Sequence, residues 1–172
     1  MASEMTVGDV AEFLNLMEEN GIDVVVDGGW GIDALLGYQS RRHLDLDIAI
    51  EHRHVPALRK ALEQDGYVEV SGHGTHTYNF VLGDNMGHLI DVHSYEFDDT
   101  GQLRFGIAYP FDSLQGTGRI FDKTVRCITP ERVVEFHTAY IGDDDDYRDV
   151  LALCQKFDLP IPEQYADWSP SQ

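Results

Sequence analysis

Two aspartates, Asp45 and Asp47, stand two residues apart in a run from Leu44 to Ile50 that alternates apolar and acidic residues. This alternation predicts a half-buried strand with both carboxylates on one face, their bases roughly 6–7 Å apart. Two like charges side by side are costly unless cations neutralise them. Mg²⁺ prefers carboxylate, phosphate and water oxygens, so the pair predicts a magnesium site.

Asp91 is a third candidate ligand, within the apolar strand sequence Leu89-Ile90-Asp91-Val92. An unpaired carboxylate is expensive in such a setting. If this strand lies beside the first, three carboxylates could hold two ions about 3.5–4 Å apart, the clamp used in phosphoryl transfer. A lone Asp-x-Asp is often only a surface strand end. The third aspartate and an upstream glycine pair favour the catalytic interpretation.

That glycine pair, Gly28-Gly29, follows a strand expected over Ile22 to Val26 and precedes a short helix expected over Gly31 to Leu36. Glycines here allow backbone N–H groups to approach phosphate, and the N-terminus of a helix favours negative charge. A strand–Gly-Gly–helix turn alone is usually only a tight turn. Trp30, next in sequence, either lines the pocket or packs in the core.

The remaining elements predict an α/β (α+β) fold, a mixed sheet with flanking helices and a small helical segment at the C-terminus. A first helix begins at the N-cap Thr6, and another begins at Pro56. Two more helices follow Thr129, and residues 95–125 have no clear assignment. We expect a catalytic domain over residues 1–125 and a helical segment over 126–172. Further strands are expected over Tyr67–Val70, Thr77–Leu82 and His88–His93.

Composition restricts the partners. The chain has 172 residues, and 12 basic against 31 acidic side chains give a net charge of −19. Such a surface repels nucleic acid backbones and anionic membranes, and favours divalent metals and a cationic acceptor. Solubility or adaptation to salt explains the charge equally well. No apolar stretch long enough to span a bilayer and no secretory signal are visible, so we expect a cytoplasmic protein. Cys127 and Cys154 have no metal-type spacing and are expected to be buried free thiols.

The segments Asp27-Gly-Gly-Trp-Gly-Ile-Asp33 and Arg41-x-His43-x-Asp-x-Asp47, with Asp91 on a later strand, resemble the lincosamide and aminoglycoside nucleotidyltransferases. These belong to the polymerase β-like nucleotidyltransferase superfamily. The resemblance runs from about residue 7 to the C-terminal helices and implies that superfamily's fold. Its Gly-Gly-Trp to Asp-x-Asp part is specific, and the C-terminal third is weaker.

The resemblance also implies a role for each matching residue. Asp45 and Asp47 would bind two Mg²⁺ ions that bridge the triphosphate of ATP or another NTP. Asp91 would bind one ion and help to remove a proton from the acceptor hydroxyl. The other implied contacts are with phosphate: Gly28 and Gly29 would cradle it, Arg41 would offset its charge, and His43 would contact it or brace the loop.

The expected reaction is transfer of a nucleoside monophosphate, AMP from ATP, to a hydroxyl of a small molecule, a lincosamide, with release of pyrophosphate. We expect a monomer or homodimer with neither nucleic acid nor membrane as partner. An aminoglycoside acceptor is the alternative, although Leu44 stands where aminoglycoside enzymes often carry another aspartate. Glu96 and Glu135 remain alternative bases.

Two other classes of protein have some support in the sequence. A non-catalytic antitoxin on this fold has no reason to keep the glycine pair and all three aspartates. A metallohydrolase is suggested by His88, Asp91 and His93, but no standard zinc signature is present. His93 would support the site or contact substrate, and His137, on the apolar stripe of a helix, is expected to be a core or cleft-lining residue. Four others are expected to be surface or packing residues: His52, His54, His73 and His76.

Overall fold

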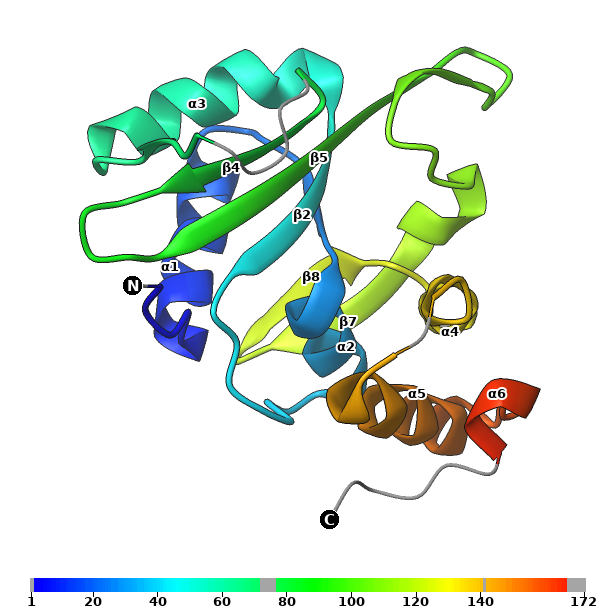
Figure 1. The fold of residues 1–172 in the computed structure, drawn as a ribbon. Coiled ribbons are helices and arrows are strands. Elements are labelled where there is room, and N and C mark those ends of the chain that lie inside the picture. The colour runs from blue at the N-terminus through cyan, green and yellow to red at the C-terminus, as the bar shows by residue number, and fades with distance from the viewer. Residues whose placement is uncertain (1, 72–76, 141, 167–172) are drawn as a thin grey trace.

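The computed structural model describes residues 2–71, 77–140 and 142–166. Within these residues, eight strands form one mixed sheet in the order β3-β4-β5-β2-β1-β8-β7, with β6 paired to β5 (Figure 1). The sheet agrees with the fold class expected from the sequence. The strands are β1 (Val24–Val26), β2 (Leu46–Glu51), β3 (Val68–Glu69), β4 (Asn79–Gly83), β5 (Leu89–Phe97), β6 (Leu103–Gly106), β7 (Gly116–Ile120) and β8 (Lys123–Cys127).

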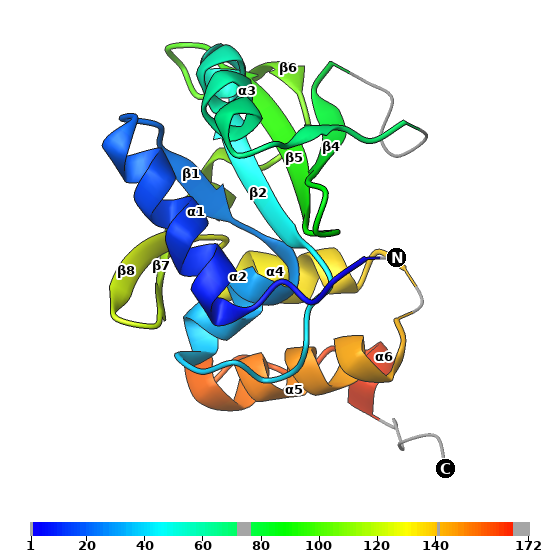
Figure 2. The same ribbon diagram turned by 90° about the vertical axis from the view of Figure 1, so that its left-hand side faces the viewer.

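The helices form two groups around this sheet (Figures 1 and 2). α1 and α3 contact each other beside the half of the sheet that contains β4 and β5, and α2, α4 and α5 gather near β7. None of the described helices is both long and apolar enough to cross a membrane. The α-helices are α1 (Val7–Glu19), α2 (Gly28–Leu36), α3 (Val55–Gln64), α4 (Pro130–His137), α5 (Asp144–Phe157) and α6 (Glu163–Ala166), and two short 3₁₀ helices are η1 (His52–His54) and η2 (Phe111–Gln115).

α1 begins where its sequence predicts. Thr6 is the N-cap and forms a capping box with Asp9, which satisfies backbone N–H groups that a helix N-terminus leaves free. The apolar stripe of the helix is buried in the core. Its buried members are Val10, Phe13, Leu14 and Met17.

The carboxylate strand begins later than the alternating sequence predicts. β2 starts at Leu46, and Leu44 is 55% exposed in the loop before it, so the prediction of a strand from Leu44 to Ile50 was wrong at its first residues. The alternation also ends within the strand, because Ala49 is as fully buried as its neighbours. Both faces of β2 are therefore covered at this point, while β5 and β1 pair with its two edges.

The glycine pair lies inside a helix rather than in a turn before it. α2 starts at Gly28, three residues earlier than expected, and Asp27 is its N-cap with the side chain accepting a hydrogen bond from the Gly28 N–H at 2.8 Å. Asparagine, aspartate, serine and threonine favour this position because their side chains satisfy free N–H groups at the start of a helix. The N-terminus of α2 therefore opens directly beside the end of β1. Gly37, in the left-handed conformation, ends α2 as predicted.

The unassigned stretch 95–125 contains the end of β5, β6, η2, β7 and most of β8. β8 pairs parallel with β1 at Val26 and Cys127, so β7 and β8 lie across the sheet from β5, whereas β6 pairs with β5 directly. Cys127 and Cys154 are buried free thiols, as expected. Helices α4 to α6 follow β8, and the division into residues 1–125 and 126–172 stays a prediction.

Candidate active site

The two strands that carry the aspartates are neighbours. β2 and β5 pair in parallel, and their register places Asp47 opposite Asp91. Side chains opposite each other on adjacent strands share one face of the sheet. The sequence left this adjacency as a condition, and the strand pairing meets it. Two carboxylates therefore face the same space beside α2.

His93 is the third member of this cluster. It lies two residues after Asp91 on β5, and the ligand atoms of Asp47, Asp91 and His93 all lie within 4.8 Å of one another. His93 Nε2 is 3.4 Å from Asp91 Oδ1. Asp45 is not part of this compact group; it is exposed in the loop just before β2. Of the three aspartates singled out in the sequence, the described structure thus brings two together with a histidine.

The start of α2 lies directly against the Asp47 side chain. Gly28 has a φ of +55°, and a Cβ atom added to it would overlap the Asp47 carboxylate. A residue with a side chain would be strained at this φ and would also occupy the space that Asp47 uses. Gly28 is thus required both by the backbone turn and by the close approach of the carboxylate. The first backbone N–H groups of α2 lie at this same point.

Four aspartates act on one another here, and the pKa of Asp47 shows the result. Burial raises the pKa of Asp47 well above its usual value, and the negative charges of Asp45, Asp27 and Asp91 raise it further, while Arg41 lowers it. The carboxylates therefore have too little positive charge around them within the described residues. Such a cluster is stabilised by whatever brings positive charge to it, a proton or a cation.

Arg41 and His43 lie at the second glycine. A Cβ atom on Gly29 would overlap the His43 ring and crowd the Arg41 guanidinium. His43 is 3% exposed, and its Nε2 is 2.5 Å from Asp33 Oδ2 on α2. This buried pair fixes the loop before β2 to α2, and the Trp30 ring packs on His43 with ring centroids 4.9 Å apart. Trp30 is therefore a core residue, the second of the two roles weighed from the sequence.

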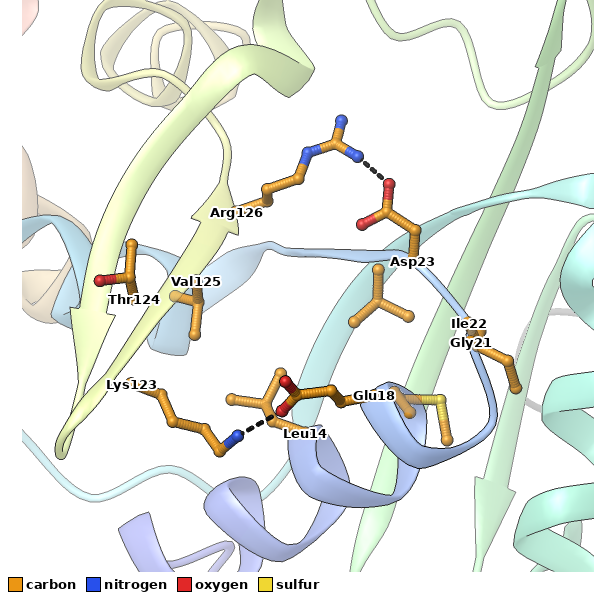
Figure 3. A pocket seen from close by; sticks show the side chains of 11 residues that line it. Leu14, Glu18, Gly21, Ile22, Asp23, Lys123, Thr124, Val125 and Arg126 are labelled. Atoms are coloured by element: carbon orange, nitrogen blue, oxygen red, sulfur yellow. Dashed lines mark hydrogen bonds and ion pairs between the residues drawn. The ribbon is translucent and has the colours of Figure 1, made fainter.

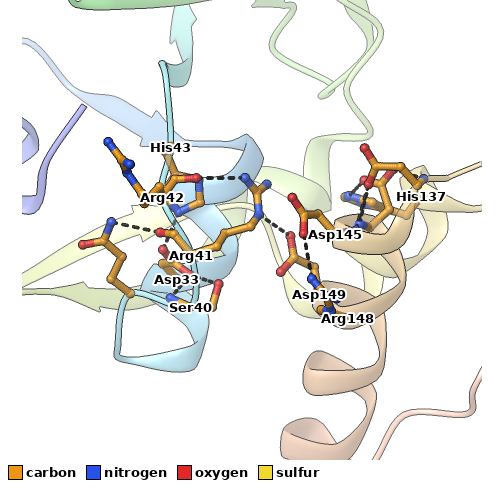
Figure 4. Close-up of polar contacts among 12 residues, drawn as sticks. Asp33, Ser40, Arg41, Arg42, His43, His137, Asp145, Arg148 and Asp149 are labelled. Atoms are coloured by element: carbon orange, nitrogen blue, oxygen red, sulfur yellow. Dashed lines mark hydrogen bonds and ion pairs between the residues drawn. The ribbon is translucent and has the colours of Figure 1, made fainter. Parts of the chain in front are cut away.

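Arg41 is also tied to the C-terminal helices (Figure 4). Its Nε donates to Asp149 Oδ2 on α5 at 3.3 Å, and its Nη1 donates to the backbone carbonyl of Arg42. Asp149 is 4% exposed, and its burial raises its pKa in spite of the partner. A guanidinium beside Gly29 is thus held in place by a buried carboxylate 108 residues further along the chain.

Tyr109 is a site residue that the sequence analysis did not find. Its hydroxyl donates to Asp27 Oδ2 at 2.6 Å and lies 3.3 Å from His93 Nδ1. Burial and the Asp27 charge raise the pKa of Tyr109 well above its usual value, so its oxygen keeps the proton. Tyr109 comes from the turn-rich stretch before η2, where no periodic pattern marks it.

The other candidates lie elsewhere or have structural partners. Glu96 is five residues beyond Asp91 on β5, about 16 Å along the strand, and pairs with Arg104 at 3.4 Å. Glu135 pairs with Arg132 on α4 at 2.5 Å. Glu96 is thus too distant from Asp91 to share its reaction centre.

Three of the other histidines have partners. His52 lies 2.9 Å from Ser94 Oγ, and His88 lies 2.8 Å from Asp84 Oδ2. His137 Nδ1 donates to the Val133 carbonyl at 2.8 Å, and its Nε2 lies 3.3 Å from Asp146 Oδ1. His73 and His76 lie outside the described residues. Structural contacts for His52 and His137 agree with the expectation from the sequence.

A hollow of about 540 Å³ lies away from these residues, between α1 and β8 (Figure 3). Its four charged side chains form two ion pairs, Lys123 with Glu18 and Arg126 with Asp23. Its cations are thus already neutralised, and the hollow has no excess positive charge for a triphosphate. The glycine and carboxylate cluster is the better candidate for nucleotide chemistry.

Comparison with known proteins identifies the family of this chain. The sequence model of the aminoglycoside-2''-adenylyltransferase family matches residues 9–153. The chain belongs to this family. It is therefore an antibiotic nucleotidyltransferase, an enzyme class that implies an NTP substrate and a divalent metal. The resemblance read from the sequence is confirmed.

Relatives of this adenylyltransferase include proteins named for two classes of antibiotic. A lincosamide resistance protein of Staphylococcus haemolyticus is 28% identical over 156 residues, which cover 88% of this chain and 96% of the relative. The lincomycin-bound lincosamide antibiotic adenylyltransferase LnuA superposes with a TM-score of 0.76 at 25% identity, covering 88% of this chain and 98% of LnuA. ANT(2'')-Ia in complex with adenylyl-2''-tobramycin superposes with a TM-score of 0.73 at 20% identity, covering 88% of each chain, and shares the fold.

Proposed function

We propose that this enzyme transfers AMP from ATP to a hydroxyl of a lincosamide in a Mg²⁺-dependent reaction that releases pyrophosphate, acting in the cytoplasm as a monomer or homodimer. The observation that carries the proposal is the pairing of Asp47 with Asp91 on parallel strands, directly against Gly28 at the start of α2. Carboxylates and helix N–H groups at one point can receive a triphosphate together with its cations.

The donor set suits divalent ions. Asp47 and Asp91 supply oxygens on one face, burial and the neighbouring aspartates raise the pKa of Asp47, and Asp45 adds an exposed carboxylate next to them. Asp45, Asp47 and Asp91 would hold two Mg²⁺ ions. Bound there, the ions would supply positive charge that offsets the charge of the triphosphate and of the attacking and leaving oxygens.

The chain's own groups bind and orient the nucleotide. Gly28 and Gly29 begin α2, where the helix dipole favours phosphate; the Gly28 N–H donates to Asp27, and the Gly29 N–H follows it in the first turn. Arg41 adds positive charge beside Gly29, held there by Asp149. His43 is buried against Asp33, so its role is to brace the loop rather than to contact phosphate.

Asp91 is the base in this proposal. It shares the face of Asp47, and a hydroxyl that attacks the α-phosphorus in line must lie within hydrogen-bond reach of its base. Glu96 is about 16 Å away along β5, which supports Asp91 over this alternative. Asp91 then accepts the hydroxyl proton as the new P–O bond forms and pyrophosphate leaves.

The acceptor class follows from the relatives. The lincosamide resistance protein and LnuA support a lincosamide, and Leu44 stands where aminoglycoside enzymes often carry an aspartate. The family description and the ANT(2'')-Ia fold favour an aminoglycoside as the second candidate. Both acceptors offer hydroxyl groups, and the carboxylate site itself does not discriminate between them.

Pyrophosphate release tests the proposal, measured with Mg²⁺ and each NTP across a panel of lincosamides and aminoglycosides. We expect release that needs ATP and a lincosamide and that is lost in Asp47→Asn. Asp23→Asn is the matched control, since Asp23 pairs with Arg126 beside the distant hollow and should leave release unchanged. Release only with aminoglycosides would reassign the acceptor, and no release with any acceptor would overturn the proposal.

A further inference from the structure

A chain of four polar side chains runs from the start of α2 to the carboxylate pair. Asp27 Oδ2 accepts from the Tyr109 hydroxyl at 2.6 Å, the Tyr109 oxygen lies 3.3 Å from His93 Nδ1, and His93 Nε2 lies 3.4 Å from Asp91 Oδ1. The four residues come from three separate parts of the chain. The direction of each hydrogen bond in this chain can be derived from donor and acceptor chemistry.

Asp27 fixes the first direction. Its Oδ1 accepts from the Gly28 N–H at 2.8 Å, and its Oδ2 accepts from Tyr109, so both carboxylate oxygens act as acceptors. A tyrosine hydroxyl has one proton, and the 2.6 Å contact commits it to Asp27. The Tyr109 oxygen can therefore only accept from His93.

His93 must then carry a proton on Nδ1. In a neutral imidazole one nitrogen is a donor and the other an acceptor, and the partner of one nitrogen decides the tautomer. With Nδ1–H facing Tyr109, the lone pair of Nε2 faces Asp47 and Asp91. This is the arrangement that orients a histidine as a metal ligand, with its second nitrogen donating to a fixed partner.

The spacing of His93 and Asp91 agrees with this orientation. The Nε2–Oδ1 separation of 3.4 Å is longer than a good hydrogen bond. Two ligand atoms each about 2.1 Å from one ion lie no more than about 4.2 Å apart, so this separation suits two ligands of a single cation.

We propose that Tyr109 and Asp27 are positioning residues that hold His93 with its Nε2 lone pair toward Asp47 and Asp91, so that one divalent ion is bound there by two carboxylate oxygens and one imidazole nitrogen. The inference rests on the proposed function only in placing a metal at this cluster. Imidazole suits transition metals, whereas Mg²⁺ prefers oxygen ligands. The site therefore favours Mn²⁺ over Mg²⁺ more than three carboxylates would.

Two spectroscopic measurements on the full chain test the proposal without turnover. Long-range ¹H–¹⁵N correlation at about pH 8, above the ordinary histidine pKa, reads the tautomer of His93 in the metal-free protein. Pulsed electron paramagnetic resonance of bound Mn²⁺ reads directly coordinated nitrogen. We expect the Nδ1–H tautomer and one nitrogen ligand, which is lost in His93→Ala. The Nε2–H tautomer, or Mn²⁺ bound by oxygens alone, would overturn the proposal.

Tyr109→Phe tests the positioning role because it removes one oxygen and keeps the ring. We expect mixed His93 tautomers and Mn²⁺ affinity lowered about 10-fold or more, with Mg²⁺ affinity changed less. Tyr165→Phe is the matched control; its hydroxyl donates to the His137 carbonyl at 2.6 Å, and both readouts should stay as in the wild type. Circular dichroism and Tm establish that both variants fold.

Unchanged tautomer and Mn²⁺ affinity in folded Tyr109→Phe would overturn the positioning role. The pyrophosphate assay separates this result from failure of the proposed function. If the protein turns over a lincosamide but binds Mn²⁺ through oxygens alone, only the proposal of a histidine ligand is contradicted. If Mn²⁺ has a nitrogen ligand but no acceptor is turned over, only the proposed reaction is contradicted.

Discussion

At Gly28, two separate requirements fall on one residue. Its φ of +55° is strained for any residue with a side chain, and an added Cβ would also overlap the Asp47 carboxylate. We expect Gly28→Ala to lower the Tm and to abolish measurable turnover, because either α2 or Asp47 must move. Thermal unfolding and pyrophosphate release check the two effects.

Gly21→Ala separates strain from overlap. Gly21 has a similar φ of +64°, but an added Cβ would meet nothing within 4 Å. Gly21→Ala should lower the free energy of unfolding through backbone strain alone, by about 1–2 kcal/mol, and should preserve turnover. If Gly28→Ala costs no more than Gly21→Ala and still turns over substrate, the close approach of Gly28 to Asp47 is not required.

Asp47 gives a prediction that depends on pH. Its folded pKa lies well above its ordinary value because of burial and neighbouring aspartates, so its charged form destabilises the metal-free fold at neutral pH. Asp47→Asn should therefore raise the Tm in EDTA at pH 7 by a few degrees, at about 2–4 °C per kcal/mol. This gain should shrink as the pH falls through the folded pKa, and vanish below the unfolded value of about 3.9.

Excess Mg²⁺ should make the Tm of the wild type higher than that of Asp47→Asn, the reverse of the order in EDTA. Binding to the native state raises the Tm of the wild type by mass action, and Asp47→Asn, with one metal ligand fewer, should gain much less. Calorimetry with EDTA or with Mg²⁺ across pH 4–8 measures both effects. A wild type that is more stable than Asp47→Asn in EDTA at pH 7 would show that its carboxylate is already neutralised by the protein.

At the scale of elements, an ion pair between a partly exposed arginine and a buried aspartate joins the loop before β2 to α5. Arg41→Gln would leave Asp149, 4% exposed, without its guanidinium partner. Since the Arg41 side chain is 34% exposed, we expect the free energy of unfolding to fall by about 1–3 kcal/mol, less than for a fully buried pair. Adding Asp149→Asn to Arg41→Gln should recover most of the lost stability, because no buried charge is then left without a partner.

The same pair has a defined pH dependence. Burial raises the pKa of Asp149, so its charged form costs stability at neutral pH and the cost fades as the pH falls through the folded pKa. The stability difference between Arg41→Gln and the double variant should thus be largest near pH 7 and smallest near pH 4. Denaturant unfolding at several pH values measures it, and a difference independent of pH would exclude Asp149 as its source.

The sequence predicts the elements that have local signals. Thr6 and its apolar stripe fix α1, and the Asp-x-Asp run together with Asp91 identifies β2 and β5 as the strands that carry charge. The predicted ends of the elements are wrong where tertiary contacts determine them. Leu44 continues the alternation but has no neighbouring strand to pair with in the described structure, so β2 begins two residues later.

Long-range partners are invisible to such patterns. Tyr109 reaches Asp27 across 82 residues and Asp149 reaches Arg41 across 108, so neither pair has a spacing that a sequence motif could record. His93 was predictable as a neighbour of Asp91 on one strand face, whereas its grouping with Asp47 depends on the β2–β5 register. The candidate site is therefore predictable in its carboxylates and not in the residues that orient them.

At the scale of the whole molecule, the charge of −19 acts on every ion that approaches the site. The described carboxylate cluster has Arg41 as the cation that lowers the pKa of Asp47, against three aspartates that raise it. A metal-free triphosphate must therefore enter against repulsion, whereas a divalent cation is attracted. Salt shortens the reach of both forces, with a Debye length of about 10 Å at 0.1 M and about 3 Å at 1 M.

Opposite salt dependences follow for the two ligands. Raising NaCl from 0.05 to 0.5 M should weaken Mn²⁺ binding several-fold, since screening removes attraction, and should strengthen binding of ATP in EDTA, since screening removes repulsion. Isothermal titration calorimetry at each salt concentration measures both. If the acidic surface serves solubility alone and the local cluster determines binding, the Mn²⁺ affinity will change little, because charges in contact are screened far less than distant ones.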